Sequence, residues 1–300
     1  MATAFNSYSG SETHIRIDPS VRYIPDHAFS GNTKLVEVVL PDSIQQIGNE
    51  AFRFCTSLAR INLCEGLRTI GNCAFSNCKS LCQVQIPSTV EYIPNMAFWG
   101  NTQLKEVKLP GSIQAIGDEA FLGCSSLKKI VLREGLRTVG NGSFERCTSL
   151  SQVDIPSTVI SIDSRAFHTC KLLEAVHLRE GLQTIGSKAF YGCETLSRVV
   201  IPSSVTEISA SVFDMCTTLV DVHLCEGLLI IDYKAFSECK SLKRIAFPST
   251  VNAIGRLAFG GCSSLKEVRF NDGLREIGIK AFHHCLSLMH INIPSNVTFM

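Results

Sequence analysis

Residues 78–98, CKSLCQVQIPSTVEYIPNMAF, belong to a pattern that recurs along the chain every 23 residues. Its phenylalanine stands at positions 29, 52, 75, 98, 121, 144, 167, 190, 213, 236, 259 and 282. Each of these phenylalanines is followed by leucine after six residues, by Val or Ile after nine, and by Leu, Ile or Phe after eleven. Self-similarity at a period of about 20–50 residues is the signature of a repeat protein, so the repeat decides the architecture.

The spacing within one repeat predicts its local structure. Val38 and Leu40 alternate with outward positions, as a short strand with one buried side requires. Pro41 cannot donate to a strand ladder and ends that strand. Ile44 and Ile47 mark a second short extended segment. Residues 49–52 have helical composition but are too few for a stable isolated helix, so one turn of α- or 3-10 helix is expected there.

One 23-residue coil cannot bury its own apolar side chains, whereas stacked coils bury them in a shared column. We therefore predict a single leucine-rich-repeat-like solenoid over residues 1–300, a right-handed coil of twelve 23-residue repeats. A parallel β-sheet is expected on one face, with second short strands, turns and one-turn helices elsewhere. Residues 1–11 are expected to be irregular and residues of about 12–28 to form an incomplete first coil.

The C-terminus is predicted to stop in the middle of a repeat, and neither end carries an evident polar cap. Solenoids need such caps, because the last coil otherwise exposes the apolar column to water. We therefore expect the C-terminal end to be covered by self-association or by a continuation of the chain.

A longer period lies above the 23-residue one. Coils that contain Pro-Ser-Thr-Val alternate with coils that contain Glu-Gly-Leu, and the alternation breaks between Pro87 and Pro110. Residues 21–89 align with residues 90–158 without gaps, so duplication of a three-coil block explains the break. Most outward strand positions differ between the two blocks. Selection for binding and neutral drift of exposed positions both predict that difference.

Composition limits the possible partners and locations. The chain has 28 basic and 27 acidic residues, a net charge of +1, which gives no electrostatic reason to expect nucleic acid or an anionic membrane. No apolar run approaches the ~18 residues that a membrane span needs. The first thirty residues lack the pattern of a signal peptide. We expect a cytoplasmic protein without membrane insertion, or a cell-surface protein if the chain is a fragment.

Ten of the fourteen cysteines stand three residues after a repeat phenylalanine, and asparagine takes that place in the other two coils. This spacing predicts a ladder of buried, reduced thiols, one in each coil, which fits a reducing compartment. Four cysteines within one stretch, Cys64, Cys73, Cys78 and Cys82, raise the alternative of a zinc site. Zinc needs four ligands that converge. Because these four fall on different parts of the coil, no metal is expected.

The sequence contains no phosphate-binding glycine loop, no His-Glu-x-x-His motif and no nucleophile elbow. No catalytic residue and no cofactor are therefore expected, and the chain is predicted not to be an enzyme.

Outward strand residues are the candidate site, because this face of a solenoid commonly binds partners. Four lysines on adjacent coils, at 105, 108, 128 and 129, could meet an acidic protein, or they could form a solvated charged face. The candidate partner-binding residues are Glu37, Arg60, Gln83, Lys105, Glu106, Lys108, Lys128, Lys129, Gln152, Asp154, His177, Arg198, Asp221, His223, Arg244, Glu267 and Arg269.

The repeat Cys-x-x-Leu-x-x-Val-x-Ile-Pro-x-x-Val-x-x-Ile-Gly-x-x-Ala-Phe resembles the BspA-type, or Treponema pallidum-type, leucine-rich repeat. Residues 78–98 match it with Pro94 in place of the usual glycine, and the resemblance covers about residues 12–300. It implies the solenoid fold. For function it implies surface adhesins of bacteria and unassigned proteins of microbial eukaryotes. We expect a non-enzymatic protein-interaction scaffold, with an adhesin or host-contact protein as the alternative if an export signal is missing.

Overall fold

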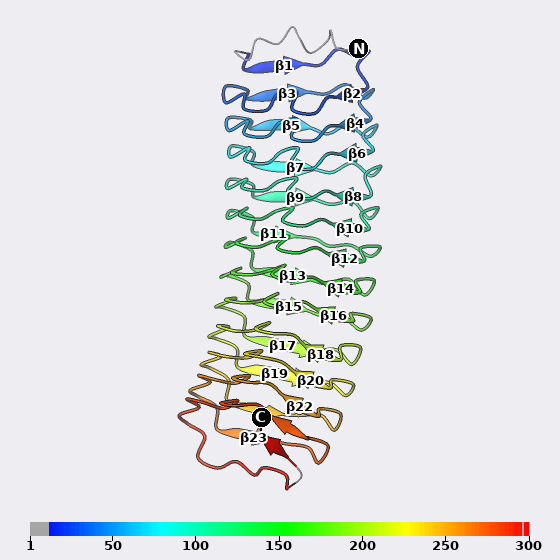
Figure 1. Cartoon of the computed structure of the whole chain (residues 1–300). Coiled ribbons are helices and arrows are strands. Elements are labelled where there is room, and N and C mark those ends of the chain that lie inside the picture. The colour runs from blue at the N-terminus through cyan, green and yellow to red at the C-terminus, as the bar shows by residue number, and fades with distance from the viewer. Residues whose placement is uncertain (1–11, 296, 300) are drawn as a thin grey trace. The chain divides into compact units, whose positions relative to one another are not determined.

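Each complete 23-residue repeat forms one coil with two short strands and a turn around its phenylalanine. The computed structural model describes residues 12–295 and 297–299. Within each part of the chain, Figure 1 shows the strands of successive coils side by side. The chain divides into two compact units, Met1–Leu150 (unit 1) and Ser151–Met300 (unit 2). Residues 1–11, which we expect to be irregular, lie outside the described residues.

In every coil but the last, the first strand that follows a repeat leucine begins two residues after it. These strands pair in parallel with a register of one repeat, so that Glu37 pairs with Arg60 and Val38 with Ile61. We call the outward side of these strands the strand face. In unit 1 the strands are β1 (His14–Arg16), β3 (Glu37–Val39), β5 (Arg60–Asn62), β7 (Gln83–Gln85), β9 (Glu106–Lys108) and β11 (Lys129–Ile130). In unit 2 they are β13 (Gln152–Asp154), β15 (Ala175–His177), β17 (Arg198–Ile201), β19 (Asp221–Leu224), β21 (Arg244–Ala246) and β23 (Glu267–Arg269).

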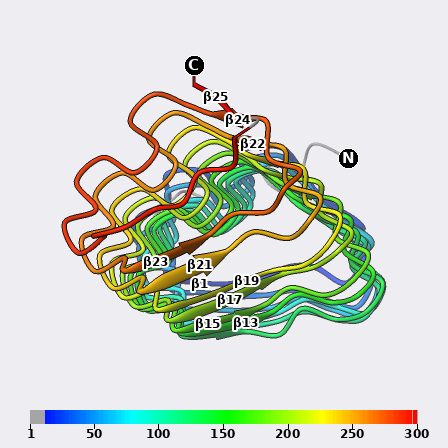
Figure 2. The ribbon, with the colours of Figure 1, turned by 90° about the horizontal axis from the view of Figure 1, so that it is seen from below.

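The second extended segment is also confirmed, as a two-residue strand with parallel pairing between coils, which in every coil but the last ends at the buried Ile or Val. Figure 2 shows the ribbon along the direction in which the coils stack, with β22 and β24 on a different side of the coil from β21 and β23. These strands in unit 1 are β2 (Tyr23–Ile24), β4 (Gln46–Ile47), β6 (Thr69–Ile70), β8 (Tyr92–Ile93), β10 (Ala115–Ile116) and β12 (Thr138–Val139). In unit 2 they are β14 (Ser161–Ile162), β16 (Thr184–Ile185), β18 (Glu207–Ile208), β20 (Ile230–Ile231), β22 (Ala253–Ile254), β24 (Glu276–Ile277) and β25 (Thr298–Phe299).

The repeat phenylalanines form the centre of the core in each unit. Phe75 and Phe98 stack with ring centroids 5.4 Å apart and an 8° angle between the rings, and Phe190 and Phe213 repeat this arrangement at 5.5 Å. Each of these four side chains is fully buried. The leucines, valines and isoleucines of the repeat surround the rings. The predicted column of apolar side chains, and with it the solenoid fold, is confirmed.

The prediction of a one-turn helix before each phenylalanine is wrong, because the described residues form turns there and contain no helix. Backbone φ is positive two residues before and two residues after each repeat phenylalanine, as at Glu50 (54°) and Phe54 (59°). These conformations interrupt a right-handed helix. They also turn alternate N–H groups toward the next coil, so that Phe52 N donates to the Ala74 carbonyl at 2.8 Å. Bonds between coils replace the bonds that a helix would make along its own chain.

The cysteine ladder is confirmed, and its thiols donate hydrogen bonds to the preceding coil. Cys55 Sγ donates to the carbonyl of Phe29 at 3.0 Å, and Cys216 Sγ donates to that of Phe190 at 3.2 Å. Both thiols are fully buried. Burial raises the pKa of Cys55 to about 12, and it has the same effect on Cys124.

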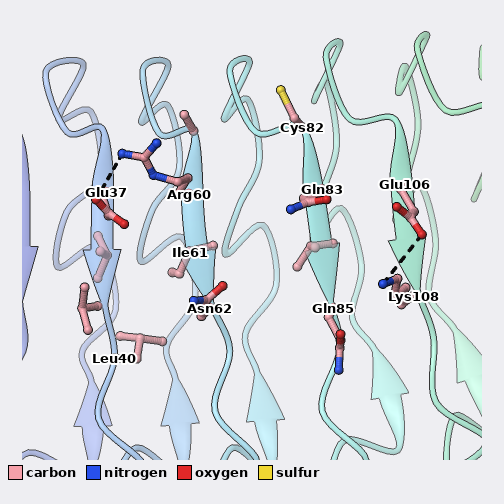
Figure 3. Close-up of a pocket in the computed structure, with 14 residues that line it drawn as sticks. Glu37, Leu40, Arg60, Ile61, Asn62, Cys82, Gln83, Gln85, Glu106 and Lys108 are labelled. Atoms are coloured by element: carbon pink, nitrogen blue, oxygen red, sulfur yellow. Dashed lines mark hydrogen bonds and ion pairs between the residues drawn. The ribbon is translucent and has the colours of Figure 1, made fainter.

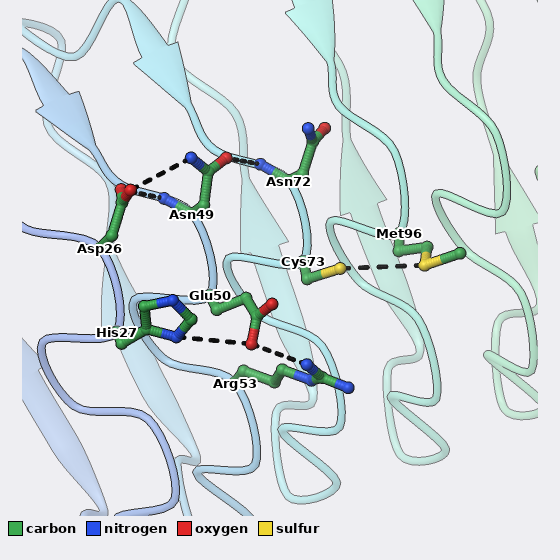
Figure 4. Close-up of polar contacts among 8 residues, drawn as sticks. All are labelled: Asp26, His27, Asn49, Glu50, Arg53, Asn72, Cys73 and Met96. Carbon is green, nitrogen blue, oxygen red and sulfur yellow. Dashed lines mark hydrogen bonds and ion pairs between the residues drawn. The ribbon is translucent and has the colours of Figure 1, made fainter.

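These thiols are expected to resist modification until the chain unfolds. With a pKa of about 12, only about one thiol in ten thousand is ionised at pH 8, and the native packing also blocks access. Thiol-reactive reagents should therefore label the exposed Cys82 first. Cys73, which is half-buried with its Sγ 3.8 Å from Met96 Sδ, should react more slowly (Figure 4). Mass spectrometry of the labelled protein measures this, and rapid native labelling of Cys124 would contradict it.

A ladder of Asp and Asn side chains joins the coils of unit 1 beside the second strands. Asn49 N donates to Asp26 Oδ1 at 2.7 Å, and Asn72 N donates to Asn49 Oδ1 at 2.9 Å (Figure 4). The ladder continues through Asn95 and Asp118. Each side chain satisfies a backbone N–H where the next coil turns away from its strand, so the ladder fixes the spacing between coils.

The structure explains why proline coils alternate with Glu-Gly-Leu coils. Glu226 Oε1 accepts a hydrogen bond from Ser249 N at 3.1 Å, and its Oε2 accepts one from Ser249 Oγ at 2.8 Å. Glu180 and Ser203 repeat the arrangement one pair of coils earlier. The two kinds of coil are therefore complementary, because a carboxylate in one receives the donors of a serine in the next.

These hydrogen bonds predict a pH dependence of stability. The bonds from Ser249 N and Oγ lower the pKa of Glu226 below its ordinary value of 4.5. A lowered folded-state pKa means that the stabilisation is present above about pH 4.5 and is lost as the pH falls further. The melting temperature should therefore drop on acidification from about pH 6 to about pH 3. Glu226→Gln should lower the melting temperature at pH 6 and flatten this dependence, whereas Glu207→Gln, an exposed glutamate of β18, should do neither.

The last coil departs from the expected repeat. Continuation of the repeat after Phe282 predicts a first strand around residues 290–292, but the structure has no strand from residue 288 to residue 295. The register also shortens, because Ile277 pairs with Phe299, 22 residues on. The exposed apolar side chains at this end are Ile279, Leu286 (79% exposed), Met289 (87% exposed) and Ile293. Self-association through this end stays a prediction, which sedimentation velocity of the protein and of a Leu286→Glu, Met289→Glu variant would check.

Candidate functional site on the strand face

The first strands position the candidate side chains by simple alternation. In β9 the pattern is exposed, buried, exposed, so Glu106 and Lys108 point outward while Val107 fills the core. All the candidate residues lie on these strands or immediately before them, and all are exposed except Glu37 and Asp221, which are half-buried. Parallel pairing without offset then places equivalent side chains of neighbouring coils side by side.

The strand face of unit 1 is hollowed over β3, β5, β7 and β9. The hollow measures about 570 Å³ (Figure 3). Arg60 Nη2 lies 3.3 Å from Glu37 Oε2 at one edge, whereas the middle carries the amides of Gln83 and Gln85 and the thiol of Cys82. This part of the face is polar but nearly neutral. It offers hydrogen-bond donors and acceptors to an extended ligand without a net charge.

A second hollow of unit 1 is strongly basic. It measures about 470 Å³ over β9 and β11, and its lining includes Lys105, Lys108, Lys128, Lys129, Arg133, Glu106 and Val131. We call these residues the basic hollow. The structure thus brings together the four lysines that the sequence predicted to cluster. Arg133 was missed, although its signal was present in the sequence: it stands where other coils have proline, directly after the end of the strand segment.

The strand face of unit 2 carries charges that are mostly paired. His177 Nδ1 lies 2.5 Å from Asp154 Oδ1, and Arg198 Nη2 lies 2.6 Å from Asp221 Oδ2. Each pair joins two neighbouring coils. The hydrogen bond with His177 lowers the pKa of Asp154. Hollows of about 500 Å³ and 260 Å³ lie beside these pairs. Exposed ion pairs contribute little to the free energy of unfolding. These residues therefore determine the charge of the surface more than the stability of the fold.

The four cysteines considered for zinc do not converge. Cys78 Sγ donates to the Phe52 carbonyl and Cys64 Sγ to the Ile44 carbonyl, which are separate parts of the interior. Cys82 points outward on β7, and Cys73 lies in a turn. Within residues 12–295 and 297–299, no three His, Cys, Asp or Glu side chains are grouped as metal ligands.

The part of the chain that the structure describes holds no helix of the length and hydrophobicity that a bilayer crossing requires.

Parallel strands in register, a buried column of repeat side chains and an exposed, variable strand face together define a leucine-rich repeat protein. The family model for the BspA type leucine rich repeat region matches residues 2–113, 93–220 and 183–300. The chain therefore belongs to the BspA-type leucine-rich repeat family, and the resemblance noted in the sequence is confirmed. Leucine-rich repeat proteins typically serve as scaffolds for interactions and are generally not enzymes.

Solved structures of bacterial leucine-rich repeat proteins share this fold. A leucine-rich repeat protein from Bacteroides ovatus is 28% identical, with a TM-score of 0.80, and the match covers 96% of this chain and 83% of that one. A leucine-rich repeat protein from Eubacterium ventriosum is 21% identical, with a TM-score of 0.60 over 95% of this chain and 80% of that one. No curated protein matches the chain.

Proposed function

We propose that the strand face binds a protein partner and that the chain acts as a non-enzymatic scaffold. The observation that carries this proposal is the set of hollows on the strand face, among them those of about 570 Å³ and 470 Å³, lined by side chains that change from coil to coil. The buried side of the same strands keeps its Val or Ile in every coil. A constant frame with a variable, hollowed and exposed surface suits recognition of a partner by a few clustered residues.

Site-specific photo-crosslinking in cells that make the full chain tests which face meets the partner. A photoreactive residue would replace Gln85 or Val200, which are exposed on the strand face, and, as matched controls, Arg165 or Lys188, which are exposed in the turns around the phenylalanines. We expect one partner to be crosslinked from the strand-face positions and not from the turn positions. Crosslinks to a partner from the turn positions alone would overturn the proposal.

The cellular location expected from the sequence is a separate proposal. A cytoplasmic scaffold and a surface adhesin both use a binding face, so the strand face does not distinguish them. Fractionation of cells that make the full-length protein, with protease treatment of intact cells, would decide between the two locations.

A further inference from the structure

The basic hollow has a more specific implication, which builds on the protein-binding role proposed above. We propose that it takes an acidic segment of the partner, an extended peptide rich in Asp and Glu with an apolar side chain among them.

The charge of the basic hollow stands out against that of the whole chain. The chain has a net charge of +1, whereas the hollow gathers four lysines and Arg133 around one carboxylate, Glu106. Lys108 Nζ lies 4.0 Å from Glu106 Oε1, at the limit of an ion pair. Lys129 is the register partner of Glu106 on the next strand. The lining thus has five cationic side chains and one carboxylate, and a surface of this composition attracts a negatively charged partner and speeds its association.

The size and the lining of the hollow favour an acidic peptide over a nucleic acid or a sulfated glycan. Two neighbouring strands lie about 4.8 Å apart, and an extended peptide advances about 3.3 Å per residue, so the basic hollow spans only a few residues. A nucleic acid duplex presents its phosphates over a helical turn of about 34 Å, far more than two coils. The hollow also contains Val131, which is 46% exposed beside the lysines. An apolar side chain of a peptide can cover this valine, whereas a sulfated glycan brings none.

Arg133 is oriented for such a ligand. Its Nε donates to the carbonyl of Leu109 at 3.1 Å, which fixes the plane of the guanidinium at the edge of the hollow. The terminal nitrogens of a guanidinium match the two oxygens of a carboxylate, and a fixed guanidinium loses less side-chain freedom when it binds. We expect Arg133 to bind one carboxylate in this geometry while the lysines attract the others through charge.

A fluorescein-labelled peptide, Glu-Asp-Glu-Leu-Glu-Asp-Glu, is the direct probe, with the Gln/Asn version as control. Fluorescence anisotropy at about 50 mM salt should detect binding of the acidic peptide and not of the control. The affinity should fall at least about tenfold in Lys108→Glu, Lys129→Glu and should weaken as salt rises to about 200 mM. Lys243→Glu, Lys266→Glu, an equal change of charge beside β21 and β23 of unit 2, should bind within about twofold of the native protein.

Folding and the alternatives are controlled separately. Thermal melts should be nearly unchanged in both charge-reversed variants, and Lys108→Gln, Lys129→Gln provides a milder change that avoids new repulsion with Glu106. Equal losses of peptide affinity in both charge-reversed variants would overturn the inference, as would binding of a sulfated oligosaccharide but not of the acidic peptide, or binding of neither. Strand-face crosslinks found together with any of these failures would leave the protein-binding role standing and remove only the acidic ligand.

Discussion

Replacing Phe98 by alanine is expected to cost about 3–5 kcal/mol of unfolding free energy, because it empties the space of a fully buried ring. The ring stacks on Phe75 and on Phe121, each at 5.4 Å between centroids, so both neighbouring coils lose contacts. Denaturant unfolding followed by circular dichroism measures the loss. Since coils contact mainly their neighbours, hydrogen exchange should rise first in the coils around residue 98.

The matched control for this substitution is Phe54→Ala. Phe54 is 42% exposed and lies against Arg53, whose guanidinium carbon is 4.8 Å from the ring centroid. Its loss should cost less than about 1 kcal/mol. Equal losses for the two variants would mean that burial of the repeat phenylalanine is not the main source of stability.

Gly227→Ala should have the second large effect, of about 2–4 kcal/mol. Gly227 has a backbone φ of +106°, a conformation that residues other than glycine rarely adopt. An added Cβ would also fall well inside van der Waals distance of the Ser203 carbonyl oxygen in the preceding coil. Because that atom belongs to the backbone, it cannot turn aside, and the coil must shift. The shift would also strain the hydrogen bond from Gly227 N to Thr250 Oγ1, which is 3.1 Å long.

Gly111→Ala is the control, in the corresponding turn of a proline coil but one position earlier in the repeat. Its φ is not positive, and an added Cβ would meet no atom within 4 Å. Stability should stay the same or rise by up to about 1 kcal/mol, since alanine has less freedom than glycine in the unfolded chain. Thermal melts of both variants provide the comparison, and a destabilised Gly111→Ala protein would argue against it.

Most of the fold could be predicted from the sequence because the same pattern of apolar positions occurs in every repeat. Positions nine and eleven residues after each phenylalanine are apolar in every coil, so the buried side of the first strand was unambiguous. The turn was not predictable. Positive φ before the phenylalanine is adopted by Glu50, Lys188 and Leu257, residue types that do not favour it. Backbone hydrogen bonds to the neighbouring coil impose this conformation, and the local sequence does not indicate them.

The sequence could predict which strand side chains line the candidate site, but it could not predict the shape of the hollow. Alternation along the strand placed Glu106 and Lys108 outward, and the constant register placed Lys129 beside them. The shape of the hollow depends on the conformations that the long Lys and Arg side chains adopt across the sheet. Arg133 joins it because its Nε bonds the Leu109 carbonyl of the preceding coil, a contact between residues 24 positions apart that neither residue indicates alone.

The complementary Glu and Ser coils set a parity rule for how such an array can change length. Adding or deleting two coils keeps unlike neighbours together, whereas a step of one or three coils places two of the same kind side by side. At the one place where two complete proline coils adjoin, the position that carries Ser88, Ser203 and Ser249 elsewhere is Gly111, so no serine hydroxyl is left without its carboxylate. Lineages of this protein should therefore differ in length by 46 residues more readily than by 23.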